Sequence, residues 1–216
     1  MIEIKNINKK YGEKIIFDNF SINLTEGEIT VILGESGTGK TTFLKILAGI
    51  EKFEGKIENL PENASFVFQE DRLLPFKTVE ENLVFALGKG EYDQALKSVG
   101  LEGEKNKYPD ELSGGMARRV ALLRAFLFKS ELMLMDEPFS SLDIAVKYKL
   151  MNLFLDMWKK DRRTTVLVTH NIDEALYLGK RIVILGKNGK ILFDRSNCGE
   201  NLREEIIGIF MENEKQ

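Results

Sequence analysis

The sequence lacks several features, and each absence excludes a class of protein. Its one cysteine, Cys198, cannot form an internal disulfide, which favours a reducing compartment. Residues 1–5 hold one acidic and one basic side chain and no basic stretch leading into an apolar run, so no secretory signal is recognisable. No uncharged apolar run approaches the ~18 residues of a membrane-spanning helix. We therefore expect a cytoplasmic chain that reaches a membrane only through a partner.

An excess of positive charge is also missing. The 31 Lys and Arg residues are balanced by 34 Asp and Glu, for a formal net charge of -3 at pH 7 and a pI near 5.5. Duplex nucleic acid requires a surface that neutralises many phosphates, so we expect no nucleic-acid partner. The 216 residues suffice for one substantial core and hardly for two, so we treat 1–216 as a single domain.

The most specific feature that is present is a phosphate-binding pattern. Residues 34–41, Gly-Glu-Ser-Gly-Thr-Gly-Lys-Thr, fit G-x-x-x-x-G-K-[ST], in which backbone N–H groups and a helix N-terminus surround phosphates. An apolar strand at 29–33 and an amphipathic helix at 40–48 give the required context. Lys40 would contact the outer phosphates, and the Thr41 hydroxyl would bind Mg²⁺. The predicted nucleotide-binding residues of this segment are Gly34, Glu35, Ser36, Gly37, Thr38, Gly39, Lys40, Thr41 and Thr42.

The order of the expected strands and helices indicates an α/β fold. Residues 2–7 and 15–24 alternate apolar and polar side chains, as half-buried antiparallel strands do. After Ser113, helices and apolar strands alternate, which builds a parallel sheet. The other expected strands are 56–58, 65–68, 132–135, 165–169, 182–185 and 190–193, and the helices are 78–87, 91–99, 113–128, 144–160, 172–178 and 202–211. We predict a P-loop NTPase with a mostly parallel core sheet, an N-terminal antiparallel β lobe and a helical insert, a subdomain at about residues 72–128.

Two carboxylates close the apolar strand at 132–135. Nucleotide hydrolysis needs one carboxylate to hold hydrated Mg²⁺ and another to orient or deprotonate the attacking water. Asp136 would take the metal and Glu137 the water. Taken alone, two acids before Pro138 fit an ordinary turn equally well, so both interpretations stay open at this point.

Residues 112–116, Leu-Ser-Gly-Gly-Met, form a third signal. A serine that caps a helix, followed by two glycines, can present backbone N–H groups to an anion. By itself, an ordinary helix cap with a flexible entry explains the same residues.

Taken in order, these residues resemble the ATP-binding subunit of an ABC transporter over nearly the whole chain. His170, the only histidine, directly follows an apolar strand, as the family's switch histidine does. Tyr11 lies where the family stacks an aromatic ring on adenine, although an aromatic that packs in a turn is the alternative. The matching motifs are Walker A at 34–41, the Q-loop at Gln69, the signature at 112–116, Walker B at 132–137 and the D-loop at 140–143.

The resemblance implies that the chain is an ATPase with ATP and Mg²⁺ as cofactors. The metal would be held by Thr41, Gln69 and Asp136. Glu137 would act as the base and His170 would stand near the γ-phosphate, with Gln69 and Lys40 completing the catalytic set.

The resemblance also implies partners. Two copies would pair head to tail, with Ser113, Gly114 and Gly115 of one copy completing the ATP site of the other. The pair would drive solute import through a transmembrane permease, with a separate solute-binding protein. The chain would then be cytoplasmic and peripheral on the inner face of the cell membrane.

Two flanking segments narrow the resemblance further. Residues 68–76 and 169–176 look most like the importer subgroup that handles nitrate, sulfonates, taurine and pyrimidine precursors of thiamine. Within the first segment, Leu73, Leu74 and Phe76 would either form the groove for a permease's coupling helix or pack inside the helical insert.

Met116 departs from the family pattern, which usually has glutamine there. Methionine loses the amide's hydrogen bonds but keeps its length and flexibility. We therefore expect an altered affinity across the dimer interface and no loss of function.

Three other interpretations fit the sequence less well. An ABC-type ATPase acting on DNA or in translation would need coiled-coil or zinc-bearing inserts or a strongly basic surface, which this sequence lacks. A soluble kinase or GTPase that shares only the phosphate loop is disfavoured by Gln69 and residues 112–116. A non-hydrolysing regulatory subunit is disfavoured by the intact Glu137.

Overall fold

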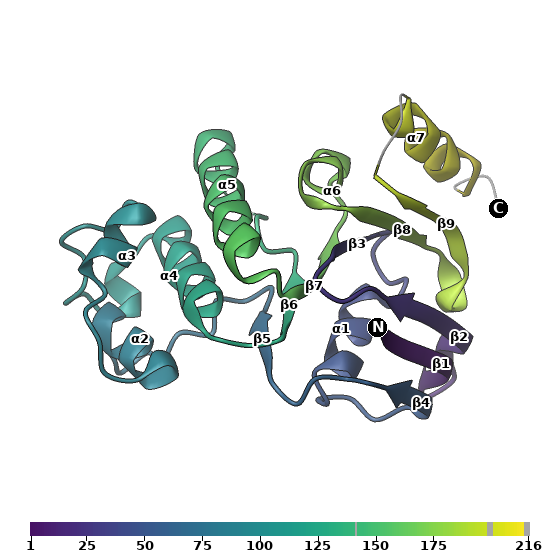
Figure 1. The fold of residues 1–216 in the computed structure, drawn as a ribbon, viewed down its shortest axis with the longest axis horizontal. Helices are drawn as coiled ribbons and strands as arrows, with labels where there is room; N and C mark the ends of the chain where they lie inside the picture. Colours follow the sequence, from purple (N-terminus) through teal and green to yellow (C-terminus); the bar gives the residue numbers. More distant parts are fainter. Residues whose placement is uncertain (141, 198–200, 214–216) are drawn as a thin grey trace.

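The computed structural model describes residues 1–140, 142–197 and 201–213, and a six-stranded sheet forms its centre (Figure 1). The strand order is β5-β6-β7-β3-β8-β9, and all neighbours are parallel except β8 and β9, which pair antiparallel. The predicted, mostly parallel core sheet is confirmed. Its strands are β3 (Ile29–Leu33), β5 (Ala64–Val67), β6 (Leu132–Asp136), β7 (Thr164–Thr169), β8 (Arg181–Leu185) and β9 (Ile191–Ser196).

The three central strands determine where a site can form. Every residue of β3, β6 and β7 is buried, because both faces of the sheet are covered by other elements. These strands are adjacent and parallel, so their carboxyl ends meet at one edge of the sheet, where open α/β sheets bind ligands. The phosphate loop follows β3, Asp136 ends β6 and His170 follows β7. The topology therefore brings three separate sequence motifs to one place.

A second, antiparallel sheet is formed by the N-terminal strands, as the sequence predicted. Its order is β2-β1-β4, with β1 at Ile2–Tyr11, β2 at Lys14–Leu24 and β4 at Glu54–Glu58. Strand β1 runs past the expected residue 7 to Tyr11, because Tyr11 pairs with Lys14 across a tight hairpin turn at Gly12. Tyr11, the last residue of β1, lines the same cleft as residues of the phosphate loop.

Helix α1 (Lys40–Leu47) packs between the two sheets (Figure 1). Its Phe43 contacts Phe20 edge to face, with ring centroids 5.4 Å apart, and Phe17 at 6.4 Å. Such aromatic pairs add to the energy of burying the rings. This apolar packing fixes the helix whose first turn carries Lys40 and Thr41.

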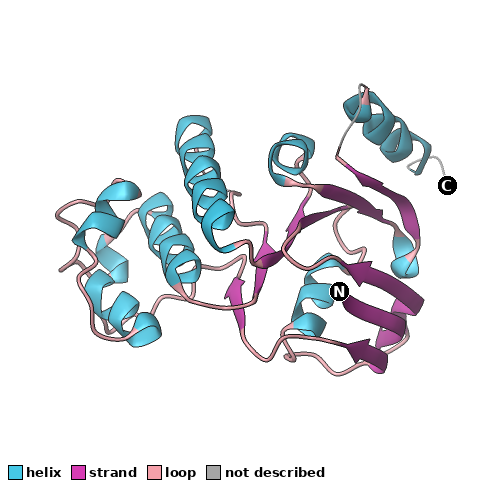
Figure 2. Cartoon of the chain, in the orientation of Figure 1, coloured by secondary structure: helices cyan, strands magenta, loops and turns pink. Residues whose placement is uncertain are grey.

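The remaining α-helices cover the other face of the central sheet or lie beyond its edge (Figure 2), whereas η2 packs against β2. The helix expected at 78–87 begins with a capping box in which Thr78 and Glu81 are partners. The last hairpin turns through η2, and its second strand begins at Ile191 and continues to Ser196, beyond the expected 190–193, because it pairs with the whole of β8. The elements are α2 (Val79–Leu87), α3 (Asp93–Ser98), η1 (Pro109–Glu111), α4 (Gly114–Leu127), α5 (Ile144–Asp161), α6 (Ile172–Leu178), η2 (Lys187–Gly189) and α7 (Leu202–Asn213).

Within the described ranges, no helix has both the length and the apolar character needed to cross a membrane. Cys198 and Ser141, the second residue of the expected D-loop, lie outside the described residues.

Candidate active site

The loop between β3 and α1 has the backbone shape that close approach to phosphates requires. Gly39 caps α1 in the left-handed region at φ 101°, where glycine carries no steric penalty. A Cβ on Gly34 would lie only 2.4 Å from the carbonyl oxygen of Leu185, so any larger residue there would displace β8. The glycines of the pattern are therefore required by this local geometry.

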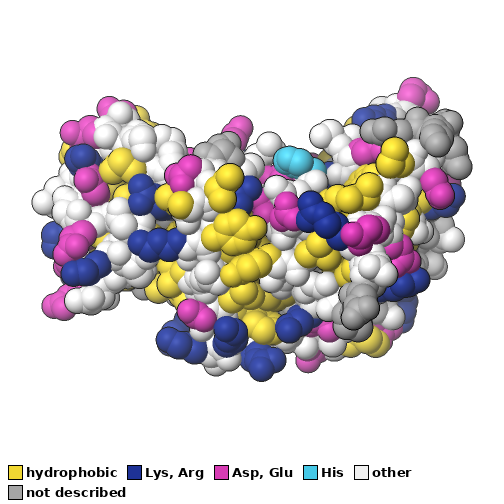
Figure 3. Space-filling model, turned by 90° about the horizontal axis from the view of Figure 1, so that it is seen from above, with side chains coloured by type: hydrophobic (Ala, Val, Ile, Leu, Met, Phe, Trp, Pro, Cys, Tyr) yellow, Lys and Arg dark blue, Asp and Glu magenta, His cyan; other side chains and the backbone are white. Residues whose placement is uncertain are grey.

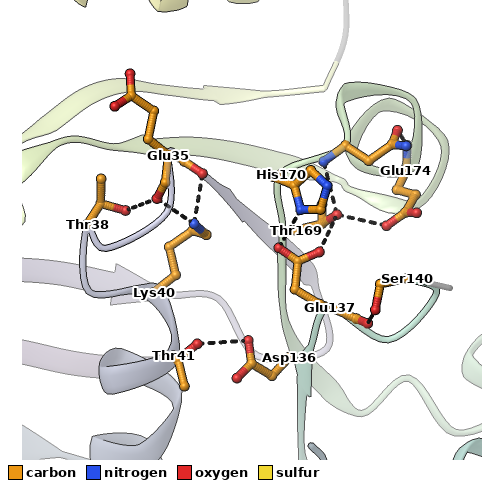
Figure 4. A network of polar contacts seen from close by, with 12 residues as sticks. Glu35, Thr38, Lys40, Thr41, Asp136, Glu137, Ser140, Thr169, His170 and Glu174 are labelled. Atoms are coloured by element: carbon orange, nitrogen blue, oxygen red, sulfur yellow. Dashed lines mark hydrogen bonds and ion pairs between the residues drawn. The ribbon is translucent and has the colours of Figure 1, made fainter. Parts of the chain in front are cut away.

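Lys40 lies inside this loop (Figure 4). Its side chain is buried, and Nζ donates to the carbonyl oxygens of Gly34 at 2.7 Å and Glu35 at 2.8 Å. Burial lowers the pKa of Lys40, and the nearby carboxylates of Glu137 and Asp136 partly oppose that shift. The loop thus holds a desolvated ammonium at its centre, where an anionic phosphate would compensate the cost of burial.

Thr41 and Asp136 form the candidate magnesium site. The Thr41 hydroxyl donates to Oδ1 of Asp136 at 3.1 Å, across the gap between α1 and the end of β6 (Figure 4). Asp136 is 3% exposed, and burial raises the pKa of its carboxyl group because the charged form is desolvated. A cation bound beside the carboxylate would offset this cost. No group of three or more His, Cys, Asp or Glu in the described part of the chain could enclose a metal. This donor set fits Mg²⁺, which usually takes one or two carboxylates and completes its shell with water and phosphate oxygens.

Glu137 adopts an uncommon backbone conformation at the end of the same strand. Its φ is 47°, in the left-handed region that costs a non-glycine residue energy, on the order of 1–3 kcal/mol. The backbone N–H donates to the carbonyl of Val168 on β7 at 2.9 Å. The carboxylate, 13% exposed, points to His170, whose Nδ1 lies 2.8 Å from Oε1 (Figure 4). The strained backbone thus turns this carboxylate into the cleft.

His170 itself is open to solvent, with 68% of its side chain exposed. In the space-filling view, the only histidine of the chain appears at the hollowed upper edge between the two halves of the molecule (Figure 3). An ionised carboxylate only accepts hydrogen bonds, so Nδ1 of His170 is the donor in its contact with Glu137. Its Nε2 is the ring nitrogen that takes no part in this contact.

A buried carboxylate that was not predicted from the sequence, Glu174, is connected to Glu137 through the hydroxyl of Thr169. Glu174 is 2% exposed, and its Oε2 accepts from the Thr169 hydroxyl at 2.8 Å while its Oε1 contacts Nζ of Lys147 at 2.7 Å. The same hydroxyl is 3.4 Å from Oε2 of Glu137. The sequence shows Glu174 only as the third helical residue after Asn171, a capping pattern that predicts an exposed side chain. The burial arises from packing of α6 against β7, which no local pattern reveals.

Lys40, Asp136, Glu137 and His170 line one cleft with a volume of about 510 Å³. Gln69 enters it from the segment after β5, and Tyr11 closes it from the N-terminal sheet with 44% of its surface exposed. Of the predicted site residues, the structure brings together Tyr11, Ser36, Gly37, Gly39, Lys40, Thr41, Thr42, Gln69, Asp136, Glu137 and His170 as its lining.

Three residues of the phosphate loop are outside this lining. Gly34 supplies a carbonyl to Lys40, and Thr38 donates its hydroxyl to the carbonyl of Glu35 at 2.9 Å. The Glu35 side chain points away from Lys40, and its Oε1 accepts from Asn213 on α7 at 3.2 Å (Figure 4). Of the three, Gly34 and Thr38 shape the loop, whereas the Glu35 carboxylate faces outward.

The residues of 113–115 are separate from this cleft. Ser113 caps α4, its hydroxyl accepting from the N–H of Met116 at 3.3 Å, and it is exposed. A Cβ on Gly114 or Gly115 would meet nothing within 4 Å, so the chain leaves open space in front of both glycines. The side chain of Met116 packs against the larger hydrophobic core. A single copy of the chain therefore does not unite the signature residues with its own phosphate loop.

This combination of fold and site defines a class. The sequence profile of the ABC transporter family matches residues 17–140, so the chain belongs to that family. It is an ATP-binding cassette, an ATPase that binds ATP with Mg²⁺.

Similar proteins and structures give the particular relatives. The chain is 41% identical over 191 residues to aliphatic sulfonates import ATP-binding protein SsuB 2 of Pseudomonas syringae pv. tomato, a match that covers 86% of this chain and 82% of that protein. SsuB of Bacillus subtilis is 40% identical over 191 residues, covering 82% and 75%. The dimeric structure of a bacterial ABC transporter cassette superposes with a TM-score of 0.82 at 32% identity, covering 92% of this chain and 100% of that one. A post-hydrolysis state of that cassette, bound to ADP and Pi, gives 0.79.

Proposed function

We propose that the chain is the ATPase subunit of a membrane importer and that the cleft described above is its hydrolytic site. The observation that carries the proposal is the convergence of Lys40, Asp136, Glu137 and His170 from three adjacent strand ends on one cleft. The import function is supported by the names of the relatives, which are import ATP-binding proteins.

The residues of the phosphate loop bind and orient the nucleotide. The backbone N–H groups of residues 34–39 and the ammonium of Lys40 hold the outer phosphates, and Tyr11 offers its ring to the base. Thr41, Asp136 and Gln69 would hold Mg²⁺, which neutralises phosphate charge when bound. The buried Lys40 and Asp136 are poised for this role because ATP and a cation each compensate a desolvated charge.

Glu137 acts as the general base. It takes a proton from the attacking water, whose oxygen bonds to the γ-phosphorus while the bond to the bridging oxygen of ADP breaks. His170 donates through Nδ1 to the carboxylate and so fixes its direction, with Nε2 facing the γ-phosphate. The site is open toward solvent at His170, which leaves a face to be covered.

We propose that a second copy of the chain covers this face. Ser113, Gly114 and Gly115 are exposed or bordered by open space and lie away from their own cleft, so they are free to meet the nucleotide of the other copy. The similar cassette was solved as a dimer, which supports this arrangement.

The helical subdomain, assigned to residues 72–128, is the proposed contact with the permease. Phe76 is 91% exposed and Phe85 69% exposed, whereas Leu73 packs against the core. Of the three groove candidates, Phe76 is exposed, whereas Leu73 and Leu74 are partly buried. Through this contact the chain would sit on the inner face of the membrane, and a separate solute-binding protein would deliver the solute. The relatives' names favour an aliphatic sulfonate as that solute.

The test uses Glu137→Gln, which keeps the side-chain shape and cannot accept the proton. We expect ATP affinity to stay within about threefold while hydrolysis falls at least about a hundredfold, and stable ATP-bound dimers to appear in analytical ultracentrifugation. Glu204→Gln, at an exposed position of α7, is the matched control. Normal turnover by Glu137→Gln would remove the base assignment, and a monomer at saturating ATP would remove the dimer.

The import step has its own test. With the permease and binding protein co-expressed, membrane vesicles should take up a labelled aliphatic sulfonate when ATP is supplied, and vesicles with Glu137→Gln should not. Uptake of nitrate in place of the sulfonate would keep the importer assignment and change the solute.

A further inference from the structure

Arg118 has more polar contacts than its position in the sequence suggests. It lies on α4, on the first turns after Ser113, and only 4% of its surface is exposed. Its guanidinium contacts two segments outside α4, one that carries Gln69 and one that carries Glu137. Its Nε donates to the carbonyl of Pro138 at 2.9 Å, Nη2 to that of Glu137 at 2.9 Å, and Nη1 to Phe68 O at 2.6 Å, Gln69 O at 3.3 Å and Asp71 Oδ1 at 3.3 Å.

Most of these acceptors are backbone carbonyls. Burial lowers the pKa of Arg118, yet a guanidinium stays charged in proteins, so the fold holds a desolvated cation here. Its one carboxylate partner, Asp71, is only partly buried. Buried charges of this kind contribute little net stability compared with apolar residues of similar size. The contacts are therefore better explained by the geometry that they impose on two loops.

The contact with Glu137 acts on a strained residue. The carbonyl of Glu137 accepts from the N–H of Ser140 at 3.2 Å, from its hydroxyl at 2.8 Å and from Arg118. These three bonds oppose any rotation of the backbone out of φ 47°. Such a rotation would swing the carboxylate away from His170, because the carbonyl group and the side chain of Glu137 turn together about its N–Cα bond. Arg118 thus fixes the direction of the carboxylate without touching it.

We propose that Arg118 is a positioning residue that links the helix beginning at Ser113 to both Gln69 and Glu137. When Ser113 docks on a second copy, α4 can shift. Because the guanidinium of Arg118 is rigid and hydrogen-bonded to both loops that border the cleft, a shift of α4 moves these loops as well. The inference rests on the proposed function, since it assumes that Glu137 is the base.

A second arginine on the same helix provides a matched control. Arg124 is partly buried, and burial lowers its pKa, as it does for Arg118. Its guanidinium donates only to the carbonyls of Asp71 and Arg72, between 3.1 and 3.3 Å, and does not reach Gln69 or Glu137. Loss of Arg124 therefore removes hydrogen bonds from the same helix to backbone carbonyls. It leaves the hydrogen bonds of Arg118 to Gln69 and Glu137 intact.

The experiment compares Arg118→Gln, Arg118→Lys, Arg118→Ala and Arg124→Gln with the wild type and Glu137→Gln, with the permease assembled. Each protein is measured for bound ATP per chain, kcat and KM. We expect Arg118→Gln to bind ATP at full stoichiometry with KM changed less than about threefold and kcat reduced about thirtyfold or more. Arg118→Lys should recover part of kcat because its ammonium can still reach one or two carbonyls. Arg124→Gln should stay within about threefold of the wild type.

Chemical rescue separates positioning from folding. Millimolar guanidinium should restore part of kcat in Arg118→Ala and have no effect in Arg124→Gln or Glu137→Gln. If Arg118→Gln and Arg118→Ala do not fold, Arg118→Lys decides: full stoichiometry with kcat reduced about tenfold supports the proposal, and a wild-type kcat overturns it.

Three results would overturn the inference. These are a kcat of Arg118→Gln within about threefold of the wild type, a loss of kcat that only follows a loss of bound ATP, and an equal loss in Arg124→Gln. Normal hydrolysis by Glu137→Gln would instead overturn the proposed function, so the two failures are distinguishable.

Discussion

Nδ1 of His170 lies 2.8 Å from Oε1 of Glu137, so an exposed imidazole is tied to a largely buried carboxylate. The bond joins the end of β7 to the end of β6, and it leaves Nε2 of the same ring available to the nucleotide. In the proposed mechanism, His170 therefore has two separable effects on hydrolysis, one on the carboxylate and one on the phosphate.

We predict that these two effects can be separated by substitution. His170→Ala removes both, and hydrolysis should fall about a hundredfold or more while ATP affinity changes less than about threefold. His170→Asn places an amide nitrogen near the position of Nδ1, so it should retain the bond to Glu137 and a rate about tenfold above His170→Ala. Steady-state ATPase assays with equal bound ATP measure this. Equal rates for the two variants would show that the contact with Glu137 contributes nothing.

A second prediction concerns the pH dependence of Asp136. Burial raises the pKa of its carboxyl group, so the folded chain binds this proton more tightly than the unfolded chain. The contribution to stability is greatest below the unfolded pKa and is lost as pH rises through the raised folded value. At pH 8 without Mg²⁺, Asp136→Asn should therefore raise Tm by about 2–4 °C, and this gain should shrink as pH falls toward 4.

The same variant should lose the stabilisation that Mg²⁺ and ATP give the wild type. Asp110→Asn, at an exposed position in η1, is the control and should match the wild type at every pH. Thermal unfolding scans between pH 4 and 8 measure these values. A gain for Asp136→Asn that is constant across this range would show that the buried carboxyl does not titrate as proposed.

A third prediction concerns the buried pair of Glu174 and Lys147, which lies next to Thr169 and His170. Glu174→Gln leaves Lys147 without its carboxylate, at 2.7 Å in the wild type, and weakens the bond from the Thr169 hydroxyl. We expect a loss of about 1–3 kcal/mol in the free energy of unfolding and a several-fold lower kcat. Lys147→Met combined with Glu174→Gln should recover part of the stability, because the unpaired ammonium is gone. A double-mutant cycle with additive effects would contradict the coupling.

These residues show where prediction from the sequence ends. The phosphate loop, Asp136, Glu137 and His170 were found because each motif follows a recognisable strand, and parallel strands bring their carboxyl ends together. Arg118 and Glu174 were not found, because their contacts with Glu137, Lys147 and Phe68 span 19 to 50 residues of the sequence. No local pattern of apolar and polar residues predicts such contacts. Ser113 was assigned to an ATP site by resemblance, and the structure of one copy places it away from its own cleft.

The last prediction concerns Met116, where the chain departs from the usual family residue. The structure packs this side chain against the core, and its N–H, not its side chain, contacts Ser113. Restoring glutamine should therefore cost a little apolar burial and add at most one hydrogen bond across the interface, so apparent ATP affinity should change by no more than about 1 kcal/mol. The kcat should stay within about threefold, because Met116→Gln leaves Ser113, Lys40 and the Glu137–His170 pair untouched. Steady-state kinetics with the assembled permease test this, with Met211→Gln, at an exposed position of α7, as the control. A hundredfold gain in kcat would show that methionine at this position holds the natural enzyme in a slowed state.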